Sequence, residues 1–280
     1  MATLAPKLPY THPFAGGYPY RGSARLPSDP DALTYLAAVA AADGAPVETA
    51  VAVAVDDFFK GIKADGTFSA IRSACLLCGA RTLAGALVPL VGTAPTNVAN
   101  GFVSGDYSRT NGLRDSGGTS LLDTNRSTTD DLQDDVHLAA YITALPSGGG
   151  GIVGAFDAGP PVVGTQLAKD GVGKFFTRCR TTNEHRTDPL ATGFVGMSRN
   201  SSSEYSKRND SSTETLSETS VAQSSVNYAV FSNATSGQPA TDAAIAFYSI
   251  GSSLGSDPAT GLADLDTRVT TLITAIGNAL

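Results

Sequence analysis

The second half of the chain, from residue 136 to residue 250, consists of short β-rich runs separated by clusters of Gly, Ser, Asn and Thr. Residues 136–143 and 243–250 are the clearest examples. Runs of this length are too short for typical helices, and the intervals between them are too short for the crossover helices that parallel strands need. The pattern therefore predicts an antiparallel body of two sheets, a rigid scaffold that displays polar loops.

Composition narrows the classes of function. With 280 residues the chain can bury a large core as a single sandwich, alone or with a small accessory module. The net charge is -7 and the lysines are scattered, which argues against a nucleic-acid-binding surface because neutralising phosphates requires clustered cations. Three cysteines cannot form an even disulfide framework, so a disulfide-dense secreted domain is excluded.

The N-terminus lacks the uninterrupted apolar core that follows the basic start of a signal peptide. No apolar run elsewhere reaches the length needed to cross a bilayer. We therefore expect a soluble protein that is made in the cytoplasm, is not inserted into a membrane, and reaches any extracellular site by a route other than secretion.

Residues 1–27 form a separate segment in which aromatic residues alternate with prolines. The aromatic residues are Tyr10, Phe14, Tyr18 and Tyr20. Proline disfavours helix and favours an extended chain, which can lay aromatic side chains into grooves on another surface. We predict that this segment docks onto a partner, and a disordered tail is the alternative.

Residues 28–97 are expected to form a small helical layer. A capping side chain precedes Pro30, where the first helix starts, and a second helix opens at Pro46. A third apolar stripe is expected to extend the layer, and each stripe must be buried against another element. The stripes are Leu33, Leu36 and Ala40; Val47, Val51, Val55, Phe58 and Ile62; and Phe68, Ile71, Cys75 and Cys78.

Cys75 and Cys78 form a Cys-x-x-Cys pair, which is also a metal and redox signature. Zinc needs four ligands, and the sequence offers neither a second such pair nor a nearby pair of histidines. A redox pair would stand at the start of a helix that follows a strand, whereas this pair is expected late on the apolar face of a helix. Both cysteines are therefore interpreted as small core residues.

Residues 98–255 are predicted to form the sandwich, and several of its strands are apolar on both faces. Such strands are expected at the centre, with one face inside the sandwich and the other under the helices. Residues 256–280 are predicted to form a helix whose apolar stripe has heptad spacing. Packing on the N-terminal helices of the same subunit is favoured, and self-association is the alternative. The stripe consists of Leu262, Leu265, Val269, Leu272 and Ile276.

Candidate catalytic groups are few. A retaining glycosidase needs two carboxylates about 5 Å apart, and Glu214 and Glu218 are evenly spaced but lack a flanking aromatic platform. His12, His137 and His185 are far apart in the sequence and are accompanied by no nucleophile motif. We therefore expect no enzymatic activity and no cofactor.

The strongest cluster of carboxylates lies in residues 130–135. It contains Asp130, Asp131, Asp134 and Asp135. The cluster is a weak calcium candidate, because it lacks the alternating oxygen ligands and the glycine of a dedicated calcium loop. A solvated acidic turn is favoured, and no metal is predicted.

Four segments carry a resemblance to a known family, namely residues 76–97, 102–113, 122–126 and 246–251. They resemble virion proteins of tailed phages, in particular phages of cyanobacteria and other aquatic bacteria. The resemblance covers roughly residues 30–280 and implies a jelly roll of the concanavalin A-like, laminin G-like type. It implies a structural role as a fibre, tail-associated or head-decorating protein and supplies no catalytic residues. It leaves out the N-terminal segment, as expected for a variable attachment region.

Together these features predict a mainly β fold, a concanavalin A-like antiparallel sandwich flanked by N-terminal helices and a C-terminal helix. The favoured function is a non-enzymatic virion protein of the fibre or tail-associated kind that contacts the host surface. A capsid cement or head-decoration protein is the alternative, and a free carbohydrate-binding lectin is third. Expected partners are other virion proteins, reached through residues 1–27, and a host-surface glycan. A homo-oligomer is expected, with a trimer favoured because the resemblance implies a fibre.

Overall fold

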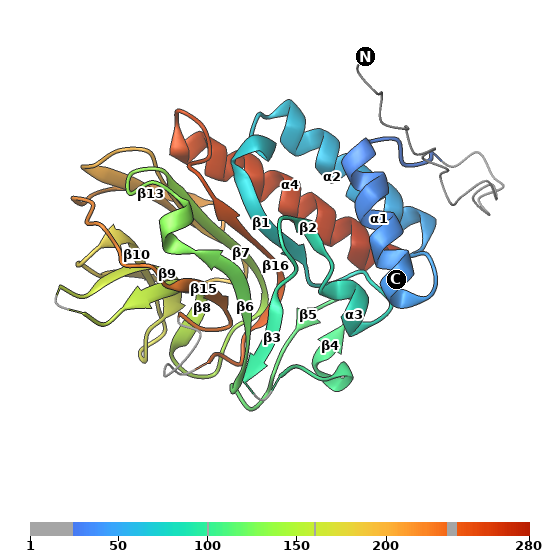
Figure 1. The fold of residues 1–280 in the computed structure, drawn as a ribbon, viewed down its shortest axis with the longest axis horizontal. Helices are drawn as coiled ribbons and strands as arrows, with labels where there is room; N and C mark the ends of the chain where they lie inside the picture. The colour runs from blue at the N-terminus through green and yellow to red at the C-terminus, as the bar shows by residue number, and fades with distance from the viewer. Residues whose placement is uncertain (1–24, 100, 160, 234–239) are drawn as a thin grey trace, which may run out of the picture.

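Two antiparallel sheets packed face to face make up most of the computed structural model, and helices lie against the outer side of one sheet (Figure 1). The structure describes residues 25–99, 101–159, 161–233 and 240–280. This architecture confirms the predicted fold class, a concanavalin A-like sandwich with N-terminal helices and a C-terminal helix beside it. The strands of the second half are divided between the two sheets.

The first sheet is the one that the helices cover. In spatial order it consists of β14 (Ser212–Ser217), β13 (Glu204–Asn209), β12 (Gly193–Arg199), β7 (Val136–Ala144), β16 (Ala244–Gly251), β1 (Ile71–Leu76) and β2 (Pro89–Val91). The short strand β5 (Gly112–Leu113) pairs with β16, and β4 (Tyr107–Ser108) pairs with β5.

The second sheet has no helix on its outer side in the view of Figure 1. In spatial order it consists of β11 (His185–Pro189), β10 (Lys174–Thr181), β9 (Val163–Lys169), β8 (Gly150–Asp157), β15 (Asn227–Val230), β6 (Ser120–Ser127) and β3 (Thr96–Ala99). Every strand pair in both sheets is antiparallel.

The first helix starts at Pro30, as its capping signal predicts, whereas the second starts at Thr49, three residues after the predicted Pro46. In α1 (Pro30–Asp43) the Asp29 side chain accepts hydrogen bonds from backbone N–H groups of the first turn, and Asp257 does the same for α4 (Pro258–Ala279). An aspartate at this position satisfies N–H groups that the helix itself leaves unpaired. The remaining helical elements are α2 (Thr49–Ala64), the short α3 (Leu83–Ala86) and 3-10 turns at Phe68–Ala70, Ser104–Asp106 and Thr128–Asp130.

Two separate cores hold the three layers together. The core between the sheets contains Leu138 of β7 and Phe175 of β10, both fully buried. The core between the first sheet and the helices contains Phe58 of α2, Phe247 of β16 and Leu265 of α4. Strands β7 and β16 contribute to both cores, which confirms that strands apolar on both faces lie centrally under the helices.

The third predicted helix is wrong, because Ile71 and Cys75 of that stripe lie in strand β1, which pairs with β16 and β2 in the first sheet. Cys75 packs between the sheets, whereas Cys78, two residues beyond the strand, packs against the helices. A strand buried on both faces is a continuous apolar run, so helical spacing can be found in it by chance. The range 28–97 is therefore not purely helical, since β1, β2 and β3 belong to the sheets.

The C-terminal helix packs within its own subunit, as favoured. All five residues of its predicted stripe are at most 1% exposed, and α4 lies against α2, β12 and β13. These five side chains are buried within the subunit, so they cannot form a coiled coil with another copy. None of the helices in the described parts of the chain is long and apolar enough to span a bilayer.

Candidate functional site

The four aromatic residues predicted to contact a partner, Tyr10, Phe14, Tyr18 and Tyr20, lie outside the described residues. The described chain begins at Arg25, immediately before α1. The place where this N-terminal segment joins the body is therefore the part of the predicted attachment site that the structure shows. We call residues 1–24 the arm and residues 25–29 the arm root.

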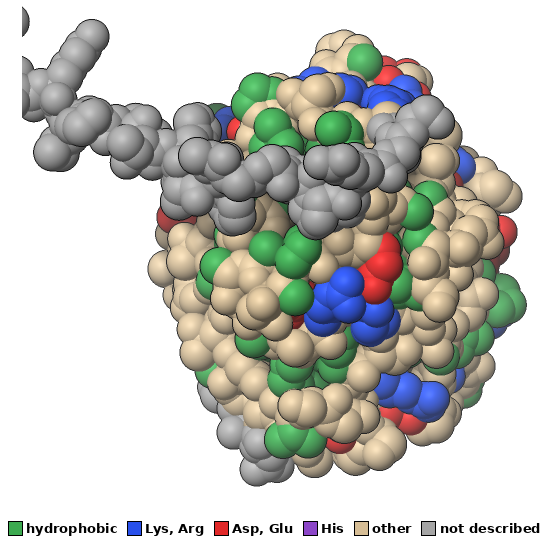
Figure 2. Space-filling model, turned by 90° about the vertical axis from the view of Figure 1, so that its right-hand side faces the viewer, with side chains coloured by type: hydrophobic (Ala, Val, Ile, Leu, Met, Phe, Trp, Pro, Cys, Tyr) green, Lys and Arg blue, Asp and Glu red, His purple; other side chains and the backbone are tan. Residues whose placement is uncertain are grey.

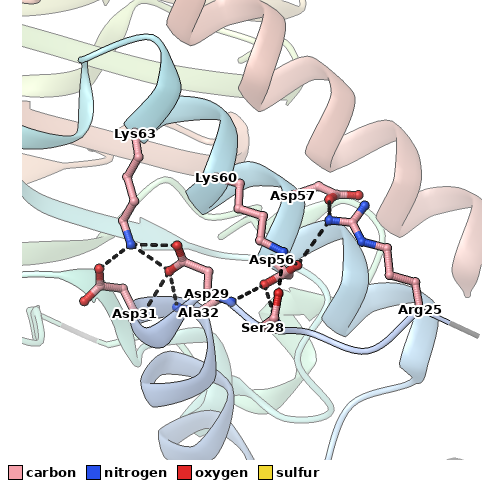
Figure 3. A network of polar contacts seen from close by, with 9 residues as sticks. All are labelled: Arg25, Ser28, Asp29, Asp31, Ala32, Asp56, Asp57, Lys60 and Lys63. Atoms are coloured by element: carbon pink, nitrogen blue, oxygen red, sulfur yellow. Dashed lines mark hydrogen bonds and ion pairs between the residues drawn. The ribbon is translucent and has the colours of Figure 1, made fainter.

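A buried aspartate of α2 holds the arm root in place (Figure 3). The side chain of Asp56 is fully buried. Its Oδ1 atom accepts hydrogen bonds from the backbone N–H groups of Ser28 at 2.7 Å and Asp29 at 2.6 Å. Its Oδ2 atom accepts a hydrogen bond from Lys60 Nζ at 2.6 Å. Burial alone would raise the pKa of Asp56, but these donors outweigh it and hold the pKa below its usual value.

Three further ion pairs flank Asp56. Lys63 Nζ lies 2.7 Å from Asp29 Oδ1 and 2.5 Å from Asp31 Oδ2, and an Arg25 Nη2 atom lies 2.5 Å from Asp57 Oδ1. The side chains of Asp31, Asp57 and Arg25 are half exposed, so each of their ion pairs contributes little to stability. The buried carboxylate is the part that fixes the backbone, because it accepts two main-chain hydrogen bonds away from solvent. This role was not predicted, although an aspartate among the apolar residues of a buried helix is a detectable signal.

The acidic segment at residues 130–135 does not converge on one point. Asp130 accepts a hydrogen bond from the Ser127 backbone N–H at 2.8 Å, and Asp131 forms an ion pair with Arg126 at 2.6 Å. Asp135 accepts a hydrogen bond from the backbone N–H of Ser253 at 2.6 Å. Their carboxylates therefore cap turns and tie the loop to the body. Asp134, the fourth residue of the calcium candidate, has one buried carboxylate oxygen without a hydrogen-bond partner. Across the described ranges, no group of three or more His, Cys, Asp or Glu residues could hold a metal ion.

The two glutamates considered as a catalytic pair have separate partners. Glu214 of β14 lies opposite Lys207 of β13, with Oε2 3.0 Å from Nζ. Glu218 accepts a hydrogen bond from Asn183 at 2.7 Å and is 2.9 Å from His185 Nε2. Burial acts to raise the pKa of Glu218, but the hydrogen bonds from Asn183 and His185 lower it overall. Glu218 is therefore not held in the protonated state that a general acid needs.

The other candidate catalytic groups have structural roles where the structure describes them. The His137 ring is fully buried and spans Ser252 O, 2.6 Å from Nδ1, and Ser249 Oγ, 2.5 Å from Nε2. Burial lowers the pKa of His137 to about 4. The thiols of Cys75 and Cys78 are buried, and burial raises the pKa of each to about 12, so neither is a thiolate near neutral pH. His12 lies outside the described residues.

Sequence analysis missed a stack of arginine and aromatic side chains on the outer face of the second sheet. Strand β10 points Phe175 and Cys179 into the core and Arg178 to the opposite face. The Arg178 guanidinium lies 5.3 Å from the Phe156 ring centre and 5.6 Å from that of Phe176. On the other side, Arg186 lies 4.9 Å from the Phe176 ring. Because these residues come from three strands, their stacking depends on the sheet register.

Glu184 links the two arginines of this stack, accepting hydrogen bonds from both Arg178 and Arg186. Arg178 is 7% exposed, while the Arg186 side chain is 46% exposed. A shallow hollow of about 260 Å³ opens beside the stack. Its lining includes Phe176, Arg186, Asn233 and the glycine-rich residues 149–151 and 171. This face thus combines an aromatic edge, planar donors and bare backbone, which are groups that can contact a polyhydroxylated ligand.

Neither a protein-family model nor a curated protein sequence matches this chain. Solved structures with similar folds include a mutant Trypanosoma rangeli sialidase that displays trans-sialidase activity. It has a TM-score of 0.45 and 10% identity, over 78% of this chain and 39% of the sialidase. The chain thus spans well under half the length of that enzyme.

Two binding domains show a comparable level of similarity. The binding domain of botulinum neurotoxin serotype D has a TM-score of 0.46 and 10% identity, over 72% of this chain and 51% of that domain. The CBM40 of the Ruminococcus gnavus IT-sialidase, bound to α2,6-sialyllactose, has a TM-score of 0.38 and 14% identity, over 50% of this chain and 86% of the module. Similarity at this level concerns the sandwich architecture alone, and it includes both an enzyme and binding domains.

Proposed function

We propose that the protein is a non-enzymatic structural component of a phage virion, in which the helix-braced sandwich is the body and residues 1–24 attach it to a larger assembly. A fibre or tail-associated location is favoured, where the loops of the sandwich would meet the host surface. Homo-oligomerisation, with a trimer favoured, is part of this proposal.

The observation that carries the proposal is the arm root. Asp56 ties the backbone at residues 28–29 to α2 through two buried hydrogen bonds, so the arm leaves the body from a fixed point. An attachment segment transmits position only if its base is rigid, because a mobile base would leave the body free to swing. The carboxylates, histidine and thiols described above support the non-enzymatic part, since they are occupied by structural contacts.

Deletion of residues 1–24 tests this proposal and leaves Arg25 and the arm root intact. The truncated protein should still fold and should be missing from purified particles, as measured by circular dichroism and by mass spectrometry. The full chain, produced from the same promoter, is the control and should be present. Normal incorporation of the truncated protein would show that the arm is not the attachment segment. Particles without the full chain would refute the virion role.

A capsid cement or head-decoration role is the alternative location for the same body. Cryo-electron microscopy of particles in which the protein carries a C-terminal tag distinguishes the two. Density for the tag on the tail or fibres supports the favoured location, and density on the shell supports the alternative.

A second candidate function is binding of a host-surface glycan at the hollow on the second sheet. The observation that favours it is the stack of Phe176 and Arg186 beside bare backbone on a face that lacks a helical cover. Aromatic faces and planar donors are the usual contacts of a protein with a sugar ring.

Glycan-array binding by the full chain and by Arg186→Ala tests this second function. The variant should lose at least about tenfold in affinity, which corresponds to about 1.4 kcal/mol. Arg81→Ala is a matched control, because the Arg81 side chain is 39% exposed and pairs with Glu48 on the helical side of the molecule. Equal binding by both variants, or no binding by the parent protein, would remove the hollow as a glycan site.

A further inference from the structure

A groove runs along the outer surface between helices α2 and α4. Its main hollow encloses about 580 Å³ and is lined by Thr49, Ala50 and Val53 of α2, by Ala275, Asn278 and Ala279 of α4, and by Arg25. A smaller hollow of about 100 Å³ shares Ala275 and continues the groove toward Phe58 and Arg268. Helices α2 and α4 are in contact below the groove. Several side chains that line it are alanines, which are too small to fill the space between the helices.

The groove is mostly apolar and open to solvent. Ala50 is exposed, and Val53, Ala275 and Ala279 are only half-buried. Leu26 and Leu280, which adjoin lining residues in the sequence, are 46% and 43% exposed. Figure 2, which looks onto this side of the molecule, shows apolar side chains reaching the surface in several patches. Apolar surface that stays in water lowers stability by about 25 cal/mol per Å², so an apolar ligand would be favoured here.

We propose that the arm of the same molecule, residues 1–24, binds in this groove and places aromatic side chains against the small residues of α2 and α4. The arm carries Tyr10, Phe14, Tyr18 and Tyr20 between prolines, so it can lie extended without losing helix or sheet hydrogen bonds. Aromatic rings over alanine-lined grooves bury a large area at a low cost in side-chain entropy.

The position of the arm root is the reason to expect the arm, and not another segment, in the groove. Arg25 is the first described residue, lines the main hollow and forms an ion pair with Asp57, which lines the smaller hollow. The arm therefore enters at the groove, and its 24 residues could extend about 80 Å. The part of α2 from residue 49 to residue 58 rises only about 14 Å, so the arm can span the groove with length to spare.

Tethering also favours the same molecule over a second copy. Covalent attachment to the body places the arm at an effective concentration in the millimolar range, far above the concentration of free protein in a dilute solution. Binding of the arm in the groove does not require that the arm also attaches to a virion. The test of this inference is therefore independent of the test of the proposed function. If both are right, assembly must displace the arm from the groove.

A single tryptophan in the arm reports this contact, because the natural chain contains none. In the full chain carrying Tyr18→Trp, the emission should be shifted to shorter wavelength and less accessible to a soluble quencher than in a peptide of residues 1–24 with the same substitution. Tyr10→Trp is a second probe for the outer part of the arm. Emission identical to that of the peptide at both positions would refute the proposal.

Groove variants show whether the contact is with these helices. Ala50→Asp and Ala279→Lys, each added to the Tyr18→Trp protein, put a charge into the groove that suits the dipole of its own helix end, so both should fold. Each should abolish the shift and speed trypsin cleavage after Arg21 about tenfold. Val172→Asp is the matched control, because Val172 is 82% exposed on a loop of the second sheet and should change neither measurement. An unchanged shift in both groove variants would place the arm elsewhere.

Dilution distinguishes the same molecule from a neighbouring one. Binding within one molecule gives a shift that does not depend on protein concentration from micromolar to nanomolar. A shift that disappears on dilution, together with dimers in sedimentation, would overturn the proposal in favour of arm exchange between two copies.

Discussion

The outer faces of the two sheets differ in what covers them. The first sheet carries Phe194 and Phe247 on its outer face, and both are buried under α2 and α4. The second sheet carries Gln166, Arg178 and Arg186 on its outer face, with no helical cover in the view of Figure 1. A sheet face rich in large apolar groups needs a cover, while a face of polar and stacked cationic groups is stable in water.

This difference suggests that the covered face serves mainly the stability of the fold and the open face mainly ligand binding. The covered face contributes a second core, so substitutions there should act on folding. The open face contributes exposed planar groups and a hollow, so substitutions there should act on ligand binding and leave the fold intact. Four measurements test this division, three on the covered side and one on the open side.

The largest effect is expected from a charged substitution under the helical cover. Val269→Asp combined with Leu272→Asp buries two carboxylates without partners and should cost more than about 5 kcal/mol, as much as the whole stability of many domains. Circular dichroism should show an unfolded protein without a cooperative thermal transition, and sedimentation should show a monomer. Thr274→Asp, at an exposed position of the same helix, is the control. A folded double variant that is merely monomeric, derived from an oligomeric parent, would instead show that the helix serves self-association.

The buried histidine of β7 should make stability fall in mild acid. The pKa of His137 is lowered to about 4 in the folded protein, against about 6.5 when unfolded. Between these values the unfolded state binds more protons, so stability is full above pH 6.5 and declines as the pH falls toward 4, by roughly 3 kcal/mol. Chemical denaturation from pH 7 to pH 4 measures it. In His137→Gln the decline over this window should be smaller, and an identical decline would assign it to other groups.

Removal of the buried carboxylate at the arm root should have an intermediate effect. Asp56→Ala leaves two backbone N–H groups without their acceptor and should cost about 2 kcal/mol, a value that allows for solvent screening of the half-exposed Lys60. Because the folded pKa of Asp56 is lowered, its contribution is complete above the unfolded pKa of about 4 and is lost as the pH falls through the folded value. Urea titrations at pH 7 and pH 2.5 should show a smaller difference between the two proteins at pH 2.5. Asp57→Ala, at an exposed position, should cost less than about 1 kcal/mol.

The smallest effects are expected on the open face. Arg186 is half exposed, so Arg186→Ala should change the free energy of unfolding by less than about 1 kcal/mol. Arg178 is buried between two rings, but two of its nitrogens lack hydrogen-bond partners, so Arg178→Ala should cost only about 1 kcal/mol. Urea denaturation of both variants measures this. A loss above about 3 kcal/mol at Arg186 would mean that the open face is part of the core, and the contrast between the faces would fail.

The sequence predicted the elements with strong local signals. Pro30 follows a capping side chain, and the first helix begins there. The runs near residues 136 and 244 became β7 and β16, and their apolar character on both faces correctly placed them at the centre. The strand β1 was misread because its spacing of apolar residues fits a helix as well as a buried strand. The arm root and the stack on the second sheet could not be predicted, since each joins residues far apart in the chain.

The sequence by itself determined the class of fold, the start of the first helix, the strands near residues 136 and 244, and the burial of the C-terminal stripe, because these follow from local capping and from the period of apolar residues. Only the tertiary structure decided which sheet face the helices cover, where Asp56 meets the arm root, and which carboxylates in residues 130–135 bind which donors. Those contacts depend on strand order and register, and on packing between elements, which bring together residues whose spacing in the sequence carries no signal.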